Sequence, residues 1–287
     1  MVGDSCSDFA VNAYCNNDGT SGFCDGSRCQ PAVRVGGGYR RLNGGLELNG
    51  KVAAKDRDFI DPVRIRGTEF TILVPESETE LVIELNAGTL LPVWTRPLSM
   101  TGLTTFSINN DPINELRVMS KSKWDSSVEI IEETPSAERG VALLRIKRNN
   151  RSQFINAKAA LISLQNGVAP PRALYFRGPP NQLVPAPLET TTAKGKATVM
   201  FPFTLPGRYR VDITTPDGST CHGAGPDQPS TVSIMIGAST LTEIGDIICD
   251  LPNARTDANA TVSMQPGSGN SGRLKMNPHP DPVMIEK

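Results

Sequence analysis

The sequence predicts an all-β protein with two β-sandwich domains, a small disulfide-rich N-terminal segment and an extended C-terminal tail. Three observations support this fold class. Short apolar runs begin roughly 10–18 residues apart, close to the even strand spacing of a sandwich. The runs are separated by turn residues, drawn from 26 glycines and 23 prolines in 287 residues. Apolar and polar residues alternate within residues 81–85 and 128–130, and no long stretch has the 3.6-residue period of a helix.

The composition divides the chain into four parts. The head is rich in Cys, Gly, Asn and Asp, and the run Val35-Gly36-Gly37-Gly38 after it is expected to be a flexible hinge. Residues 167–171, Gly-Val-Ala-Pro-Pro, are expected to form a linker because consecutive prolines interrupt strands. The expected parts are a stapled head at 1–33, a β-sandwich at 34–166, a second and immunoglobulin-like sandwich at 167–250, and a Pro/Gly-rich tail at 251–287.

The sequence predicts a separate set of strands for each sandwich. One segment is ambiguous, because the alanines of residues 156–164 also favour a short helix. In the tail, a short strand is expected at residues 283–285. The first set comprises residues 68–74, 80–86, 103–108, 115–120, 127–132, 140–147 and 158–164, and the second comprises 172–177, 196–203, 207–214, 231–236 and 241–248.

The head contains four of the six cysteines and few large apolar residues. It cannot fold by burial alone, and two disulfides closing short loops would each supply about 2–4 kcal/mol. Zinc is the alternative, but among neighbouring cysteines Cys24 and Cys29 alone approach zinc-ligand spacing and no histidine is near. The pairing in the head stays open. A third bridge is expected between Cys221 and Cys249, and the head cysteines are Cys6, Cys15, Cys24 and Cys29.

Disulfides indicate an oxidising, extracellular or cell-surface location. The first residues show neither a basic nor an apolar leader region. We therefore expect either that a leader has been removed or that the protein reaches an oxidising site another way, such as cell lysis. Asn150-Arg151-Ser152 and Asn259-Ala260-Thr261 are candidate glycosylation acceptors. No apolar stretch is long enough to predict a membrane-spanning helix.

One stretch resembles the late part of an immunoglobulin-like sandwich. In Leu-Pro-Gly-Arg-Tyr-Arg-Val-Asp-Ile, residues 205–213, a turn with Gly207 leads into a strand that starts near Tyr209, and Asp217-Gly218 follow. The resemblance implies that the Tyr209 hydroxyl bonds back to the turn backbone, that Val211 and Ile213 face the core, and that the Asp-Gly pair closes a hairpin. It extends at most over residues 168–250. Where antibody domains have a cysteine, this chain has Val211, and the fold implies nothing about function.

Groups suited to catalysis are scarce. The sequence has two histidines, His222 and His279. Cys221 and His222 are adjacent, so on a strand they would point to opposite faces and could not easily act as a thiol–imidazole pair. A glycosidase or lectin would need carboxylates or aromatics around a cleft, and Trp94 and Trp124 are isolated from other aromatic residues. We therefore expect no enzyme, no cofactor and no metal.

A calcium loop is a weaker alternative in the head. Residues 16–20, Asn-Asn-Asp-Gly-Thr, together with Asp25 could supply oxygen ligands, but they lack the alternating acids of an EF-hand. A glycine-containing turn between disulfides is the simpler interpretation.

The basic residues are unevenly distributed. Between Arg139 and Lys158 there is no acidic residue, and the candidate interaction patch consists of Arg145, Lys147, Arg148 and Arg151. A solvated strand edge is the plain interpretation, and an acidic surface of a neighbouring copy, such as Glu76, Glu78 and Glu80, is the functional one. The formal net charge of −1 argues against nucleic acid as a partner.

The sequence thus favours a non-enzymatic, extracellular structural or adhesive subunit that binds copies of itself or other surface proteins. One alternative is a viral capsid, spike or decoration protein, located in the virion, since no leader is visible in the first residues, many strands are expected and aromatic residues make up 5% of the sequence. A second alternative is a carbohydrate-binding module, in which a tryptophan would bind a glycan.

Overall fold

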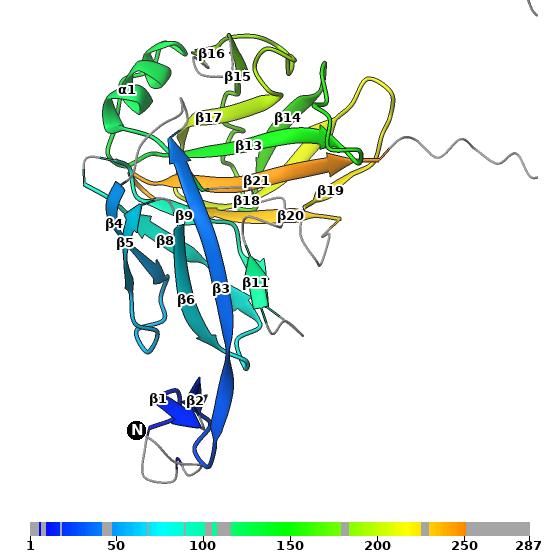
Figure 1. The fold of residues 1–287 in the computed structure, drawn as a ribbon. Coiled ribbons are helices and arrows are strands. Elements are labelled where there is room, and N and C mark those ends of the chain that lie inside the picture. The colour runs from blue at the N-terminus through cyan, green and yellow to red at the C-terminus, as the bar shows by residue number, and fades with distance from the viewer. Residues whose placement is uncertain are drawn as a thin grey trace, which may run out of the picture. The chain divides into compact units, whose positions relative to one another are not determined.

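The structure is a computed structural model that describes residues 6, 10–17, 19–41, 48–67, 69–88, 90–100, 105–107, 116–178, 184–224 and 230–250. It confirms the all-β prediction, since the described residues form strands and a single helix (Figure 1). The predicted tail lies outside the described residues. No helix among the residues that were described is long and apolar enough to cross a membrane.

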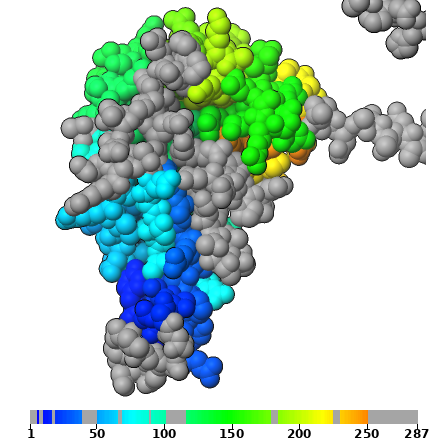
Figure 2. Space-filling view, in the orientation of Figure 1, coloured from blue at the N-terminus to red at the C-terminus, as the bar shows by residue number. Residues whose placement is uncertain are grey.

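The first sheet is organised around one 13-residue strand, β3(Cys29–Arg41). β3 pairs antiparallel with β2(Thr20–Cys24) and β6(Glu69–Pro75), and parallel with two short strands. Figure 2 shows the blue atoms of the N-terminal strands next to the cyan atoms of the strands that follow. The remaining members are β1(Tyr14–Asn17), β11(Thr105–Ser107) and β12(Leu116–Val118), and β7(Glu80–Leu81) and β10(Leu98–Ser99) form a separate two-stranded sheet.

The expected hinge at residues 35–38 is wrong. These residues lie inside β3, where Val35 pairs with Ile72 and Gly36 with Thr71 on one side. On the other side the same residues pair with Phe106 and Ser107. Glycine weakens an isolated strand, but neighbours on both sides satisfy the backbone here and hold it extended.

The second sheet has ten strands, and β13(Gly140–Arg148) lies near its middle. β13 pairs antiparallel with β17(Thr198–Thr204) and parallel with β21(Leu241–Cys249). The order is β16-β15-β17-β13-β21-β9-β8-β4-β5, with β19 joined to β21. The other members are β4(Leu48–Ala54), β5(Val63–Gly67), β8(Ile83–Asn86), β9(Val93–Thr95), β15(Leu174–Arg177), β16(Val184–Ala186) and β19(Cys221–Gly223).

A third sheet has the order β14-β18-β20 and covers one face of the ten-stranded sheet. Its strands are β14(Lys158–Ser163), β18(Gly207–Thr214) and β20(Val232–Ile236). The ambiguous segment at 156–164 therefore contains a strand, β14, and no helix. β14 pairs along its length with β18, and Ala159 and Leu161 are buried against the core. Helix propensity is a weak preference that such packing overrides.

Two cores lie on opposite faces of β13. Val141 and Leu143 belong to the first core, together with buried residues of β3, β6 and β8. Ala142, Leu144 and Ile146 belong to the second core, with residues of β14, β18 and β20. This alternation is the two-residue period of a strand buried on both faces.

The predicted boundary at 166/167 therefore does not coincide with the division between the cores. β13 and β14 come from the range assigned to the first sandwich, yet they contribute to the second core and pair with β17, β18 and β21. The described residues all belong to one compact unit. The division into two sandwich domains, at 34–166 and 167–250, stays a prediction.

The strand expected at residues 127–132 is wrong. The structure has α1(Lys121–Glu129) followed by a turn. The Ser120 side chain accepts a hydrogen bond from the Lys123 amide and caps the helix, while Trp124 and Val128 are buried four residues apart on one face. The prediction failed because it relied on the alternation at residues 128–130, whereas the helical spacing of buried residues starts earlier, at Trp124.

Candidate functional site

Two disulfides close the head. Cys6 is bonded to Cys24 and Cys15 to Cys29, which settles the pairing that the sequence left open. The cysteines form a small buried cluster of their own, with the sulfur atoms of Cys6, Cys15 and Cys24 all within 4.8 Å of one another. Because all four sulfurs are joined in disulfides, none is a thiolate that could bind zinc.

Two of the candidate calcium ligands, Asp25 and Asn16, already accept hydrogen bonds, and Asp18 lies outside the described residues. Asp25 accepts them from the amides of Ser27 and Arg28 and from the side chains of Ser27 and Gln30. These donors, with the Arg28 amide the strongest, hold the pKa of Asp25 well below its usual range. Asn16 likewise accepts from the Gly19 amide. The loop is therefore a turn that Asp25 organises between the two disulfides.

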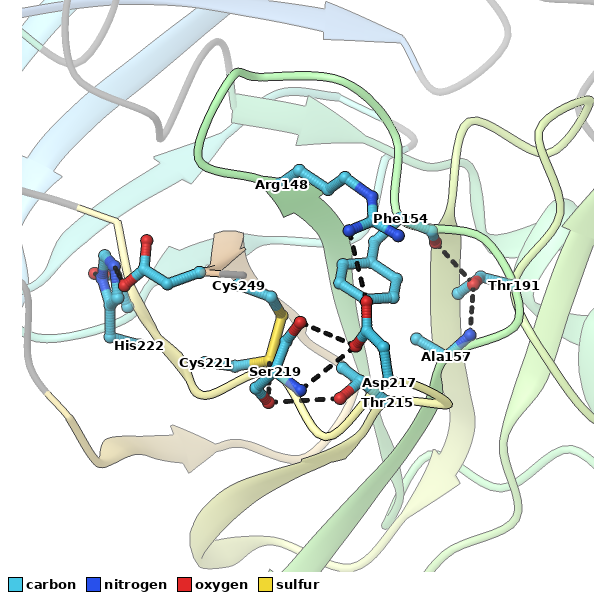
Figure 3. Close-up of a disulfide and its surroundings, with 12 residues drawn as sticks. Arg148, Phe154, Ala157, Thr191, Thr215, Asp217, Ser219, Cys221, His222 and Cys249 are labelled. Carbon is cyan, nitrogen blue, oxygen red and sulfur yellow. Dashed lines mark hydrogen bonds and ion pairs between the residues drawn. A yellow bond between two sulfur atoms is a disulfide. The ribbon is translucent and has the colours of Figure 1, made fainter. Parts of the chain in front are cut away.

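The third disulfide joins Cys221 to Cys249, as predicted. The two residues lie directly opposite each other in the antiparallel pair β19 and β21, with Cα atoms 4.0 Å apart. Figure 3 shows the bond beside the turn at Thr215–Ser219, where Asp217 accepts from the Ser219 amide and hydroxyl. The bond fixes a three-residue strand to the end of the buried β21.

His222 points away from this disulfide (Figure 3). Its Nδ1 lies 2.9 Å from the Gly223 carbonyl oxygen, and its Nε2 lies 3.5 Å from a carboxylate oxygen of Asp250. Because Cys221 is held in a disulfide, it supplies no nucleophile for the imidazole to activate. The predicted absence of a Cys–His pair thus has a structural reason, while His279 lies outside the described residues.

Three of the four residues in the candidate basic patch contact acidic side chains of the same chain. Arg145 and Lys147 both bind the fully buried carboxylate of Asp246, at 2.7 and 2.5 Å. Arg148 lies 3.3 Å from Asp217 and stacks over the Phe154 ring, 4.1 Å from its centroid (Figure 3). Arg151 is exposed in the following turn. As an intermolecular surface this patch stays a prediction.

A buried ion pair was not found from the sequence. Arg117 of β12 donates two hydrogen bonds to Glu243 of β21, one of them at 2.8 Å, and the Glu243 side chain is 1% exposed. The Gly245 amide also donates to Glu243. Glu243 and Asp246 of β21 are therefore buried acids that each pair with basic residues of neighbouring strands. The sequence signal that could have revealed them is the presence of two acids in an otherwise uncharged stretch, Leu-Thr-Glu-Ile-Gly-Asp-Ile.

The tyrosine corner implied by the immunoglobulin-like resemblance is present. The Tyr209 hydroxyl donates a 2.9 Å hydrogen bond to the carbonyl oxygen of Leu205, and burial raises the pKa of the phenol. Gly207 has a φ of 150°, and Val211 lies in the second core with Ile213 against it. The expected hairpin at Asp217-Gly218 is wrong, because β19 after this turn pairs with β21 and not with β18.

Both tryptophans pack against other parts of the chain. Trp124 is 1% exposed and donates to the Pro202 carbonyl oxygen. Trp94 is half-buried, with the Lys55 ammonium 4.6 Å from its ring centroid and Gly237 so close to the ring that a Cβ there would overlap it. An open hollow of about 530 Å³ beside β5 and β6 is lined by Val63, Arg64, Glu69, Phe70 and Thr71. These observations give no support to the carbohydrate-binding alternative.

The candidate glycosylation site at Asn150 lies in an exposed turn after β13. Its Oδ1 accepts hydrogen bonds from the amide and hydroxyl of Ser152, at 2.9 and 2.6 Å. Modification at Asn150 stays a prediction. Asn259 lies outside the described residues.

No protein-family model and no curated protein matches the chain. Among solved structures, a shaft pilin from Lactobacillus rhamnosus GG is similar over 77% of this chain and 98% of its own, with 8% identity and a TM-score of 0.23. A streptococcal ancillary pilin covers 77% and 69%, with 9% identity and a TM-score of 0.26. A pilus-presented adhesin covers 62% and 38%, with 12% identity and a TM-score of 0.25. These neighbours are β-rich pilus proteins, and their low TM-scores carry no argument about this chain.

Proposed function

We propose that the protein is an extracellular structural or adhesive subunit that acts by binding copies of itself, without catalysis. The observation that supports this most is the placement of its disulfides. Two close a head that has a core of cysteines, and the third holds a three-residue strand to the end of β21. Covalent closure at both places is suited to an oxidising environment and to a subunit that must resist unfolding.

The polar groups that could have served chemistry contribute to the fold. Asp246 binds Arg145 and Lys147, Glu243 binds Arg117, and the thiols are oxidised. The proposal is tested by sedimentation velocity of the native protein over a series of concentrations at low salt. We expect the weight-average mass to rise above the 30.8 kDa of one chain as concentration increases. A single monomeric species throughout would contradict the proposal.

A further inference from the structure

The three-stranded sheet β14-β18-β20 has one face against the second core and one face in solvent. On β18, Tyr209 and Val211 point inward, while Arg208 and Arg210 alternate with them and are exposed. On β20, Ile234 is buried and its neighbours are exposed. We call the exposed side the outer face. It consists of Lys158, Ala160, Ile162, Leu164, Arg208, Arg210, Asp212, Thr214, Ser233 and Met235.

Large apolar side chains are exposed along this outer face. Leu164 is 55% exposed and Met235 is 37% exposed. They flank Arg208, because the Leu164 amide donates to the Arg208 carbonyl oxygen at 2.9 Å and Met235 pairs with Arg208 on the other side. Ile162 lies beside Arg210 in the next row. Apolar groups gathered around cations are typical of a surface that binds another protein.

The outer face is also basic. It has Lys158, Arg208 and Arg210 against one acid, Asp212, which gives a formal charge of 3 − 1 = +2. Arg210 is already bound to Asp212 through two hydrogen bonds of 2.8 and 3.1 Å. Lys158 and Arg208 have no ion pair with any described residue. Two cations are therefore free to bind carboxylates of a partner.

An acidic surface of the same chain complements this charge. We call it the acidic loops, and it consists of the two segments at residues 55–61 and 76–80. The segments lie together, because Arg57 binds Glu78 at 2.9 Å. They carry two bases and six acids, a formal charge of 2 − 6 = −4. The bases are Lys55 and Arg57, and the acids are Asp56, Asp58, Asp61, Glu76, Glu78 and Glu80. All of these acids except Glu78 are exposed.

We propose that the acidic loops of one copy bind the outer face of the next copy, an inference that rests on the proposed self-assembly. No hydrogen bond or ion pair joins the two surfaces within the described part of one chain, so both are available to partners. Opposite charges on two different surfaces favour a heterologous, head-to-tail contact, which can extend into a chain of subunits. Arg208 binds carboxylates of the loops, and Leu164 and Met235 bury apolar area around that contact.

The experiment uses one variant of each surface. Arg208→Glu changes the formal charge of the outer face from +2 to 0, and Glu76→Lys combined with Asp58→Lys changes that of the acidic loops from −4 to 0. All three side chains are exposed, so the fold is retained, which near-ultraviolet circular dichroism checks. Arg172→Glu and Glu133→Lys are matched controls, because they reverse exposed charges outside both surfaces. Association is followed by sedimentation velocity at low and at high salt.

We expect each surface variant alone to weaken association at least about tenfold, roughly 1.4 kcal/mol, and the controls to associate like the unmodified protein. High salt should weaken association of the unmodified protein. An equimolar mixture of the two surface variants should form a complex of two chains, because one intact outer face then meets one intact pair of loops.

Three results separate this inference from the proposed function. If the unmodified protein is a monomer at every concentration, both the proposed function and the proposed contact are wrong. If the unmodified protein assembles and the surface variants assemble equally well, the contact is wrong while the proposed function stands. If each variant is impaired but their mixture forms no complex, the contact is not heterologous and the inference is overturned.

Discussion

Arg117 and Glu243, 126 positions apart in the sequence, form an ion pair in which both side chains are almost fully buried. The pair connects β12, a strand of the first sheet, to β21, a strand of the ten-stranded sheet. A buried charge is costly when its partner is lost, even where the intact pair adds little net stability. The pair therefore couples the two sheets.

Replacing one member of this pair should destabilise the protein strongly. We expect Arg117→Met to lower the free energy of unfolding by about 3–5 kcal/mol, because the Glu243 carboxylate would stay buried without its cation. Urea denaturation followed by fluorescence measures the change. The double variant Arg117→Met with Glu243→Leu should lose clearly less, and a double variant that loses the sum of both effects would argue against this coupling.

Removing the Tyr209 hydroxyl should destabilise the protein, because the hydroxyl makes the hydrogen bond of the tyrosine corner. Tyr209→Phe keeps the ring in the second core but deletes the hydrogen bond to the Leu205 carbonyl oxygen. We expect a loss of about 1 kcal/mol in the free energy of unfolding. Ser233→Ala on the exposed side of β20 is the matched control and should change little. Equal stability of Tyr209→Phe and the unmodified protein would show that the corner contributes nothing.

The third disulfide should stabilise the end of β21. We expect the double variant Cys221→Ser and Cys249→Ser to lose about 2–4 kcal/mol of unfolding free energy, since the bond closes a loop with a sequence separation of 28. Hydrogen exchange should show faster exchange in β19 than in the unmodified protein. Unchanged protection there would mean that strand pairing alone holds β19.

The turn after β18 should make the free energy of unfolding depend on pH in the acidic range. Hydrogen bonds from the Ser219 side chain, the Ser219 amide and Arg148 hold the pKa of Asp217 below its ordinary value. A depressed folded-state pKa contributes stability that is present above the unfolded value and is lost as pH falls through the folded one. We expect Asp217→Asn to lose less stability than the unmodified protein between pH values near 5 and 2. An identical acid profile for the two proteins would contradict this role.

The strands were largely predictable because their two-residue alternation is local. β18 was expected with the same bounds that the structure has, and Tyr209 was placed correctly from the turn before it. The sequence could not show that β13 serves two cores, because strand pairing over long separations leaves no local mark. Val141 and Ala142 are both apolar, as a strand buried on both faces requires, and that pattern does not say which partner covers which face.

The candidate basic patch also depends on strand pairing that the sequence does not reveal. Arg145 and Lys147 alternate with apolar residues and so resemble a solvated edge, yet β21 places Asp246 beside them. The outer face at Arg208 was missed for a related reason, since Arg208 and Met235 lie on two different strands and Leu164 directly follows a third. Pairings of this kind are tertiary, whereas the sequence pattern reports the exposure of one strand at a time.

The most direct test of the account is the mass of the native protein by light scattering, with and without reductant. We predict a mass above the 30.8 kDa of one chain under oxidising conditions, and a fall in assembled material when the three disulfides are reduced. A mass of one chain at every concentration, unchanged by reductant, would contradict both the assembly of copies and the role of the disulfides in it.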